Sequence, residues 1–175
     1  WSGPGGFTST QANITINNAT SNNAGVYTVT VTSTEGCTSV ASTTVVVYQK
    51  PSCSVTASSP VCVGDELKFT TTENLANAYS WSGPNGFVSN QKNPKIPEST
   101  LNHNGTYVLT VTSDKGCTAT ASVNVIVNPL PNVNITSKNT SGCAPLCNVG
   151  FTATSTSNIT KYEWSLGNGT TSSNS

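Results

Sequence analysis

Six cysteines have the clearest capacity for chemistry in this chain. Thiols form disulfides in oxidising compartments and, at suitable spacing, bind zinc. The six are Cys37, Cys53, Cys62, Cys117, Cys143 and Cys147. The Cys-x-x-x-Cys segment at residues 143 and 147 can close a small loop by a disulfide. Zinc is disfavoured there, because neither a second thiolate pair nor a histidine lies at the usual ligand spacing.

The other titratable residues are sparse. His103 is the only histidine and lies in a polar loop segment, so we interpret it as a solvent-facing side chain. Asp65 and Glu66 form the only adjacent acidic pair. With nearby Asn carbonyls they are weak candidate calcium ligands, although a charged loop tip is the interpretation we favour. No acid and base are paired for catalysis, so we predict no enzymatic activity and no cofactor other than this calcium.

The composition narrows the class of protein. Only 8% of the 175 residues are charged, arginine is absent, and the seven lysines balance seven acids. Nucleic-acid binding is therefore disfavoured, since it needs clustered cations. Thr, Ser and Asn make up roughly two-fifths of the chain, which is typical of strands joined by polar turns. No apolar stretch approaches the roughly 20 residues of a membrane-spanning helix.

One motif repeats along the chain. Trp-Ser-Gly-Pro-Gly-Gly-Phe at residues 1–7 returns as Trp-Ser-Gly-Pro-Asn-Gly-Phe at residues 81–87, an offset of 80. The same offset separates Tyr27 from Tyr107 and Cys37 from Cys117. A constant offset over forty residues indicates one folding unit used more than once. Since nothing precedes residue 1 to match the segment before residue 81, we expect the chain to begin inside a unit.

Alternating apolar and polar residues predict the strands of this unit. Residues 105–113 and 117–127 alternate strictly around an Asp-Lys-Gly turn, which predicts a hairpin. Upstream, residues 53–57, 67–71 and 79–81 read as further strands, and residues 93–97 as a loop. This gives about seven short strands in about 80 residues, the size and density of an immunoglobulin-type sandwich.

The expected core agrees with that sandwich. Trp81 lies on the third strand, where such folds bury a tryptophan, and Tyr107 fits a tyrosine corner, whose phenol bonds back to the upstream backbone. Phe69 and Leu109 stand where antibody domains carry a disulfide. The predicted structural core residues are Trp1, Tyr27, Phe69, Trp81, Tyr107, Leu109 and Trp164. The predicted fold class is all-β, with tandem Ig-like and PKD-like sandwiches in a linear array.

Two prolines at residues 129 and 131 mark a stiff junction between units. Tyr162 and Trp164 repeat the spacing of Tyr79 and Trp81, so a further unit of the same plan begins after the junction. We therefore predict the C-terminal part of an Ig-like domain at residues 1–49, a complete domain at 50–128, and the N-terminal part of a PKD-like domain at 129–175.

Three motifs resemble a known group of proteins. They are Cys62-Val-Gly-Asp-Glu-Leu, Tyr79-Ser-Trp-Ser-Gly-Pro-Asn-Gly-Phe, and Gly105-Thr-Tyr-Val-Leu-Thr-Val-Thr-Ser-Asp-Lys-Gly-Cys-Thr. They look like the tandem Ig-like repeats of very large secreted bacterial surface proteins, including gliding-motility adhesins exported by type IX secretion. The last unit resembles a PKD domain through Ala144-Pro-Leu and Tyr162-Glu-Trp-Ser-Leu-Gly-Asn-Gly, with Leu166 and Asn168 replacing the usual Phe and Asp.

Within the complete domain, Cys117 has two possible partners, Cys53 and Cys62. In a sandwich Cys53 and Cys117 begin the first and last strands at the same end, which favours their pairing, because bridged Cα atoms lie within about 7 Å. Repetition points instead to Cys62, which has a counterpart in Cys143 whereas Cys53 has none. We favour Cys53 with Cys117 and expect the partner of Cys37 to precede residue 1.

The leading functional prediction is a non-catalytic structural and adhesive segment, a disulfide-supported spacer rod of a long extracellular or bacterial cell-surface protein. Expected partners are neighbouring repeats of the same longer chain, other copies in a filament, and surface polysaccharide. The alternative is a carbohydrate-binding accessory module of a secreted hydrolase, using exposed rings such as Tyr48 or Phe87. We also expect the partial units to be completed by flanking sequence or by neighbouring chains, because each leaves an apolar sheet face without its mate.

Overall fold

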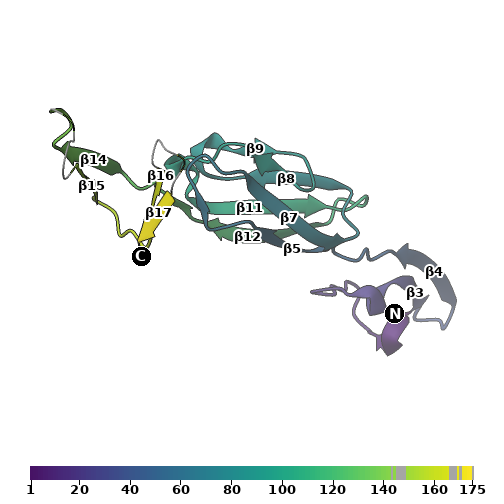
Figure 1. Cartoon of the computed structure of the whole chain (residues 1–175). Coiled ribbons are helices and arrows are strands. Elements are labelled where there is room, and N and C mark those ends of the chain that lie inside the picture. Colours follow the sequence, from purple (N-terminus) through teal and green to yellow (C-terminus); the bar gives the residue numbers. More distant parts are fainter. Residues whose placement is uncertain (143, 145–148, 166–168, 170, 175) are drawn as a thin grey trace.

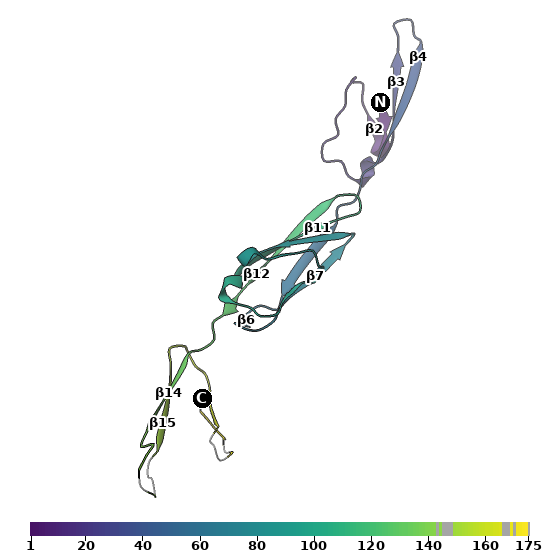
Figure 2. The same cartoon turned by 90° about the horizontal axis from the view of Figure 1, so that it is seen from above.

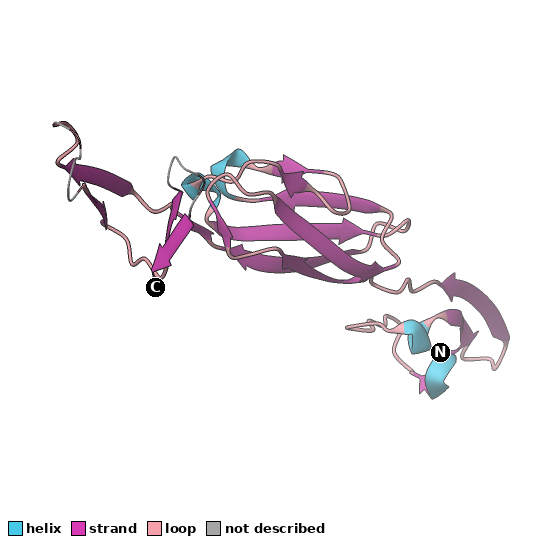
Figure 3. Cartoon of the chain, viewed as in Figure 1, coloured by secondary structure: helices cyan, strands magenta, loops and turns pink. Residues whose placement is uncertain are grey.

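The computed structural model describes residues 1–142, 144, 149–165, 169 and 171–174. Strands dominate, and the helical segments within this part are single 3₁₀ turns (Figure 3). A two-sheet sandwich built from residues 52–128, here called the middle sandwich, lies between the N-terminal and C-terminal parts of the chain in both views (Figures 1 and 2). The fold class is therefore all-β, as the alternating sequence pattern predicts.

The middle sandwich consists of two facing sheets with strand orders β10-β7-β5 and β12-β11-β8-β9, closed at one edge by parallel pairing of β6 with β13. Its strands are β5 (Ser52–Ala57), β6 (Val61–Cys62), β7 (Leu67–Asn74), β8 (Ala78–Ser82), β9 (Val88–Ser89), β10 (Lys95–Ile96), β11 (Gly105–Thr112), β12 (Thr118–Val125) and β13 (Val127–Asn128). Two 3₁₀ turns, η3 (Pro84–Gly86) and η4 (Leu101–His103), join them. This order and connectivity are those of an Ig-like β-sandwich.

The sequence prediction of a loop at residues 93–97 was wrong in part. Lys95 and Ile96 pair with Lys68 and Leu67 as the short edge strand β10. Two prolines flank this strand, which hid it from pattern reading because proline cannot donate to a ladder. The edge position tolerates them, and Ile96 is buried in the core.

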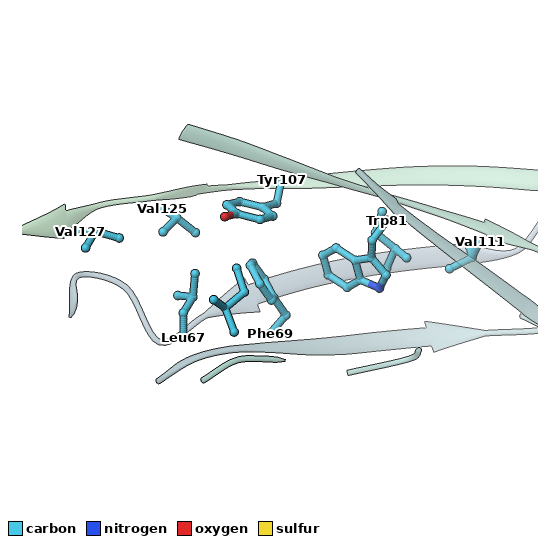
Figure 4. Packing of buried hydrophobic residues seen from close by; sticks show 9 residues of the cluster. Leu67, Phe69, Trp81, Tyr107, Val111, Val125 and Val127 are labelled. Atoms are coloured by element: carbon cyan, nitrogen blue, oxygen red, sulfur yellow. The ribbon is translucent and has the colours of Figure 1, made fainter. Parts of the chain in front are cut away.

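Aromatic stacking joins the two sheets (Figure 4). The ring of Phe69 on β7 lies 4.6 Å from Tyr107 on β11 and 5.1 Å from Trp81 on β8, measured between centroids. All three are buried, and Leu109 pairs with Trp81 across the β11 to β8 ladder. Phe69 and Leu109 thus fill the space that a bridging disulfide occupies in antibody domains.

The repeated Trp-Ser-Gly-Pro motif builds a second contact around Tyr107. A Cβ on Gly83 would lie 2.4 Å from the Tyr107 ring, so only glycine lets the backbone lie flat on it. Pro84 in turn approaches Gly105, where a Cβ would lie 2.9 Å from the proline ring. The Tyr107 hydroxyl donates to the His103 carbonyl at 3.1 Å, the hydrogen bond predicted for a tyrosine corner.

The N-terminal part repeats this arrangement in one sheet, here called the N-terminal sheet, with strand order β2-β1-β3-β4. Its elements are β1 (Ser2–Gly3), η1 (Pro4–Gly6), β2 (Phe7–Thr8), η2 (Ser21–Asn23), β3 (Gly25–Thr32) and β4 (Thr38–Val45). A Cβ on Gly3 would lie 2.5 Å from the Tyr27 ring, and the Tyr27 hydroxyl donates to Asn23 at 3.0 Å. Tyr27 is buried, but Trp1 is only half-buried, since no described strand covers its sheet face.

Two separate hairpins make up the C-terminal part: β14 (Val133–Lys138) with β15 (Gly150–Ser155), and β16 (Tyr162–Ser165) with β17 (Thr171–Asn174). Trp164 lies on β16, 6.3 Å from the Phe151 ring on β15. It is half-buried, unlike Trp81, which it was predicted to match as a core residue. Cys143, Cys147, Leu166 and Asn168 lie outside the described residues.

Gly83→Ala should destabilise the middle sandwich by about 1–3 kcal/mol, because the added methyl group overlaps the Tyr107 ring. Gly83 has φ −169°, an extended conformation open to alanine, so the penalty comes from packing alone. The midpoint of urea unfolding, followed by tryptophan fluorescence, measures the change. Ser82→Ala, one residue earlier on the exposed face, is the control, and equal stability of the two variants would contradict the packing argument.

Candidate functional site

The side chains singled out for chemistry are dispersed over the structure. Among the described residues, no group of three or more His, Cys, Asp or Glu side chains is close enough to hold a metal ion. In the same part of the chain, no helix has the length and apolar character needed to cross a membrane.

His103 has a structural task at the tyrosine corner. It is the last residue of η4, and its Nδ1 accepts the backbone N–H of Thr100 at 2.9 Å. Nε2 lies 3.4 Å from the side-chain amide of Asn85, while the His103 carbonyl accepts the Tyr107 hydroxyl. Both ring nitrogens and the backbone carbonyl thus hold the loop in place, while the His103 side chain stays partly exposed.

Asp65 and Glu66 point to different partners. The Asp65 carboxylate accepts the backbone N–H of Cys62 at 3.0 Å and so caps the turn between β6 and β7. Glu66 forms ion pairs of 2.9 Å with both Lys68 and Lys95. Hydrogen bonds from these ammonium groups lower the pKa of Glu66. Two cations already beside Glu66 oppose a third, so this pair is a poor calcium site.

Sequence reasoning missed the densest polar cluster, which surrounds Glu73 on β7. Its carboxylate accepts Lys92 Nζ at 2.7 Å, the Tyr79 hydroxyl at 3.0 Å and the backbone N–H of Ala76 at 3.2 Å. These hydrogen bonds lower the pKa of Glu73, that of Lys92 contributing most. Burial, followed by the hydrogen bond to Glu73, raises the pKa of Tyr79. Glu73 and Lys92 are 19 positions apart in the sequence, which explains why no local motif revealed the cluster.

The four described cysteines, Cys37, Cys53, Cys62 and Cys117, are free thiols in this structure. Cys53 lies opposite Glu73 in the β5 to β7 ladder, and burial, together with that carboxylate, raises the pKa of its thiol. Cys117 directly precedes β12, which lies beside β5 at the edge of the sandwich (Figure 1). Cys62 is on β6 and pairs with Asn128 at the end where β13 finishes. Because these thiols are unpaired here, the pairing of Cys53 with Cys117 stays a prediction.

Exposed aromatic rings are scattered. Phe87, one of the two rings suggested for sugar binding, packs 5.2 Å from Tyr107 and 5.8 Å from Phe69, so that suggestion was wrong for this residue. Tyr48 is 50% exposed and has Lys115 Nζ 5.8 Å from its ring centre. It lines a shallow hollow of about 440 Å³ with polar neighbours. A flat sugar platform of several adjacent rings is not present among the described residues around Tyr48.

The outward face of β11 and β12 is instead lined with hydroxyl groups. Cross-strand neighbours form rows, such as Thr110 with Thr120 and Thr112 with Thr118. Val108 pairs with Ser122 in the same face, and the outward positions of these two strands carry no charged residue. Thr pairs across strands stabilise a sheet by about 0.2–1 kcal/mol each, which accounts for them without a ligand.

The chain matches no family model and no curated protein. Solved structures that align with it include an amphioxus IgVJ-C2 molecule, at 20% identity and TM-score 0.39, over 67% of this chain and 72% of that one. The N-terminal four Ig domains of Dscam1 isoform 4.44 align at 20% identity and TM-score 0.38, over 73% and 36%. A mouse coronavirus receptor-binding domain complexed with its murine receptor aligns at 14% and 0.40, over 69% and 75%. The fold assignment rests on the strand order and core described above.

Oxidation should link Cys53 to Cys117. We expect incubation with oxidised glutathione to remove two thiols within the sandwich and to yield a disulfide-linked peptide pair containing these residues. The reaction should be slow, because the raised pKa of Cys53 reduces its thiolate fraction. Thiol titration measures the loss of thiols and peptide mapping identifies the linked pair. Cys53→Ser is the control. A peptide linking Cys62 to Cys117 would contradict the proposed pairing.

Acid should weaken the contacts of Glu73. Its folded-state pKa is lowered, so its contribution to stability is full above its ordinary value of 4.5 and is lost as pH falls through the lower folded-state value. Glu73→Gln should therefore be less stable than the wild type at neutral pH and should lose less stability on acidification. Thermal unfolding at a series of pH values measures this. The exposed Glu98→Gln is the matched control, and parallel pH curves for Glu73→Gln and the wild type would refute the assignment.

Proposed function

We propose that this chain is a non-catalytic structural and adhesive segment of a long extracellular protein on a bacterial surface. The observation that carries the proposal is the repetition of one folding unit. Gly3 on Tyr27 and Gly83 on Tyr107 make the same contact in successive units. Because the repeated motif packs backbone against an aromatic ring, it supports a structural role for each unit and not a catalytic one.

The path of the chain through the middle sandwich suits a spacer. The chain enters at the start of β5 and leaves at the end of β13, at opposite ends of the sandwich (Figures 1 and 2). Parallel pairing of Val61 on β6 with Val127 on the last strand, β13, lies close to the exit. A pull on the two ends therefore loads several inter-strand hydrogen bonds together, and units joined in this way add length.

The polar groups support the same proposal because they are used to fix loops. His103 holds η4 and Asp65 holds the β6 to β7 turn, while Glu73 ties β7 to the segment before β10. Glu73 lines a hollow beside Cys53, but its carboxylate is already held by hydrogen bonds from Lys92, Tyr79 and the backbone of Ala76. Bacterial origin, type IX export and the PKD-like character of the last unit follow from the resemblance of sequence motifs. The surface location is part of this proposal.

Small-angle scattering of the chain, diluted until it is monomeric, should give an extended particle. We expect about 35–45 Å per unit, since strands of six to ten residues rise about 3.3 Å per residue and loops add to them. A compact particle would reject the spacer role. A glycan array serves as the second measurement, and we expect no retention. Binding that Tyr48→Ala abolishes would favour the carbohydrate-binding alternative.

A further inference from the structure

Tyr48 lies in the segment that joins the N-terminal sheet to the middle sandwich, between β4 and β5 (Figures 1 and 2). Its ring centre is 5.8 Å from Nζ of Lys115, which belongs to the turn between β11 and β12. Tyr48 also lines a hollow together with Thr20 and Ser21 of the N-terminal part. It therefore lies between the two parts, with a cation of the middle sandwich against its ring.

The turn that carries Lys115 has a well-fixed backbone. The Ser113 N–H donates to the Cys117 carbonyl at 2.8 Å, and the Gly116 N–H donates to the Ser113 carbonyl at 3.0 Å. Ser113 is buried, and its hydroxyl accepts the Cys117 N–H at 3.2 Å. Gly116 has φ 77°, a left-handed conformation that glycine adopts without strain. The Lys115 side chain is thus presented to Tyr48 from a rigid base.

The same turn in the N-terminal sheet carries the opposite charge. The Ser33 N–H donates to the Cys37 carbonyl at 2.8 Å, and the Gly36 N–H donates to the Ser33 carbonyl at 3.0 Å, so the backbone bonds match. The position of Lys115 is taken there by Glu35. An aromatic ring has a negative face, which attracts an ammonium group and repels a carboxylate. The turn itself accepts either charge, so the fold alone does not require a lysine at residue 115.

The position of Tyr48 also differs between the two junctions. Its counterpart eighty residues later is Asn128, and the second junction continues as Pro-Leu-Pro at residues 129–131. Proline stiffens a segment because its ring fixes φ. Residues 46–50 of the first junction contain no proline and form neither a strand nor a 3₁₀ turn. The first junction thus has an aromatic ring beside a cation where the second has prolines.

We propose that the contact of Tyr48 with Lys115 is a latch that favours one angle between the N-terminal sheet and the middle sandwich. Pro51, directly before β5, is buried, so the segment is anchored at its end and the latch restrains the residues before it. An exposed cation on an aromatic face shifts an equilibrium by about two- to fivefold, so the latch opens reversibly. The proposal concerns this junction and does not rest on the proposed spacer function.

Nuclear magnetic resonance of the full chain tests the contact and its effect separately. The methylene protons beside Lys115 Nζ should be shifted upfield by the ring current of Tyr48, and Tyr48→Leu should abolish that shift. Residual dipolar couplings report how closely the N-terminal sheet follows the middle sandwich. We expect one common alignment in the wild type. In Tyr48→Leu and Lys115→Glu, the alignment of the N-terminal sheet should fall relative to that of the sandwich.

The chain supplies matched controls for both variants. Lys115→Glu places on the turn the residue that the other copy carries as Glu35, so the turn should keep its structure. Lys50→Glu makes the same change of net charge in the joining segment and should align as the wild type does. Tyr48→Phe keeps the ring without its hydroxyl and should retain both the upfield shift and the common alignment.

Three results would overturn the proposal. The first is a wild type whose Lys115 methylene protons show no upfield shift, since the ring would then not face the ammonium group. The second is wild-type alignment in Lys115→Glu, because the cation would then have no part in setting the angle. The third is loss of the common alignment in Tyr48→Phe, because the hydroxyl and not the ring would then hold the junction.

Discussion

The structure depends on the contact of Phe69 with Trp81 and Tyr107, since it joins one sheet of the middle sandwich to the other. Each aromatic side chain of this kind buries about 150–250 Å², which at about 25 cal/mol per Å² contributes several kcal/mol before entropy is counted. Exposed ion pairs such as Lys68 with Glu66 contribute little, because solvent screens the attraction between their charges. Stability therefore comes from a small apolar core, and a chain with 8% charged residues loses little by lacking surface charge.

The other features are arranged around that core. Gly83 allows the turn after β8 to lie on Tyr107, whose hydroxyl holds the loop before β11. The indole N–H of Trp81 donates a hydrogen bond to the Gln91 carbonyl, in the segment that follows β9. Each of these contacts involves a core aromatic side chain. The repeated Trp-Ser-Gly-Pro motif therefore supplies the residues that pack the backbone against an aromatic ring. Beside Trp1, where none of the described residues forms a second sheet, the indole N–H has no hydrogen-bond acceptor among those residues.

Polar side chains also stabilise the sandwich, because they hold its loops in place. His103, Asp65 and Glu73 are the residues on which a catalytic or metal-binding role could be built, yet each is held by backbone or lysine partners. A side chain whose donors and acceptors are already satisfied gains little from a ligand. The remaining outward groups are mostly hydroxyls and amides, which keep the surface hydrated at low charge. The polar side chains described here therefore hold the loops and edges of the sandwich in place.

The sequence by itself determined the all-β class, the repeated unit, the alternating strands and the tyrosine corner, because these depend on local periodicity and on a motif present twice. It also indicated that Phe69 replaces a disulfide cysteine. Only the tertiary structure decided that Phe87 is packed rather than exposed, that Lys95 and Ile96 form an edge strand, and that Glu73 meets Lys92. These depend on contacts between segments far apart in the chain, which no local pattern records. The partial burial of Trp1 and Trp164 has the same cause, since burial is set by the facing sheet.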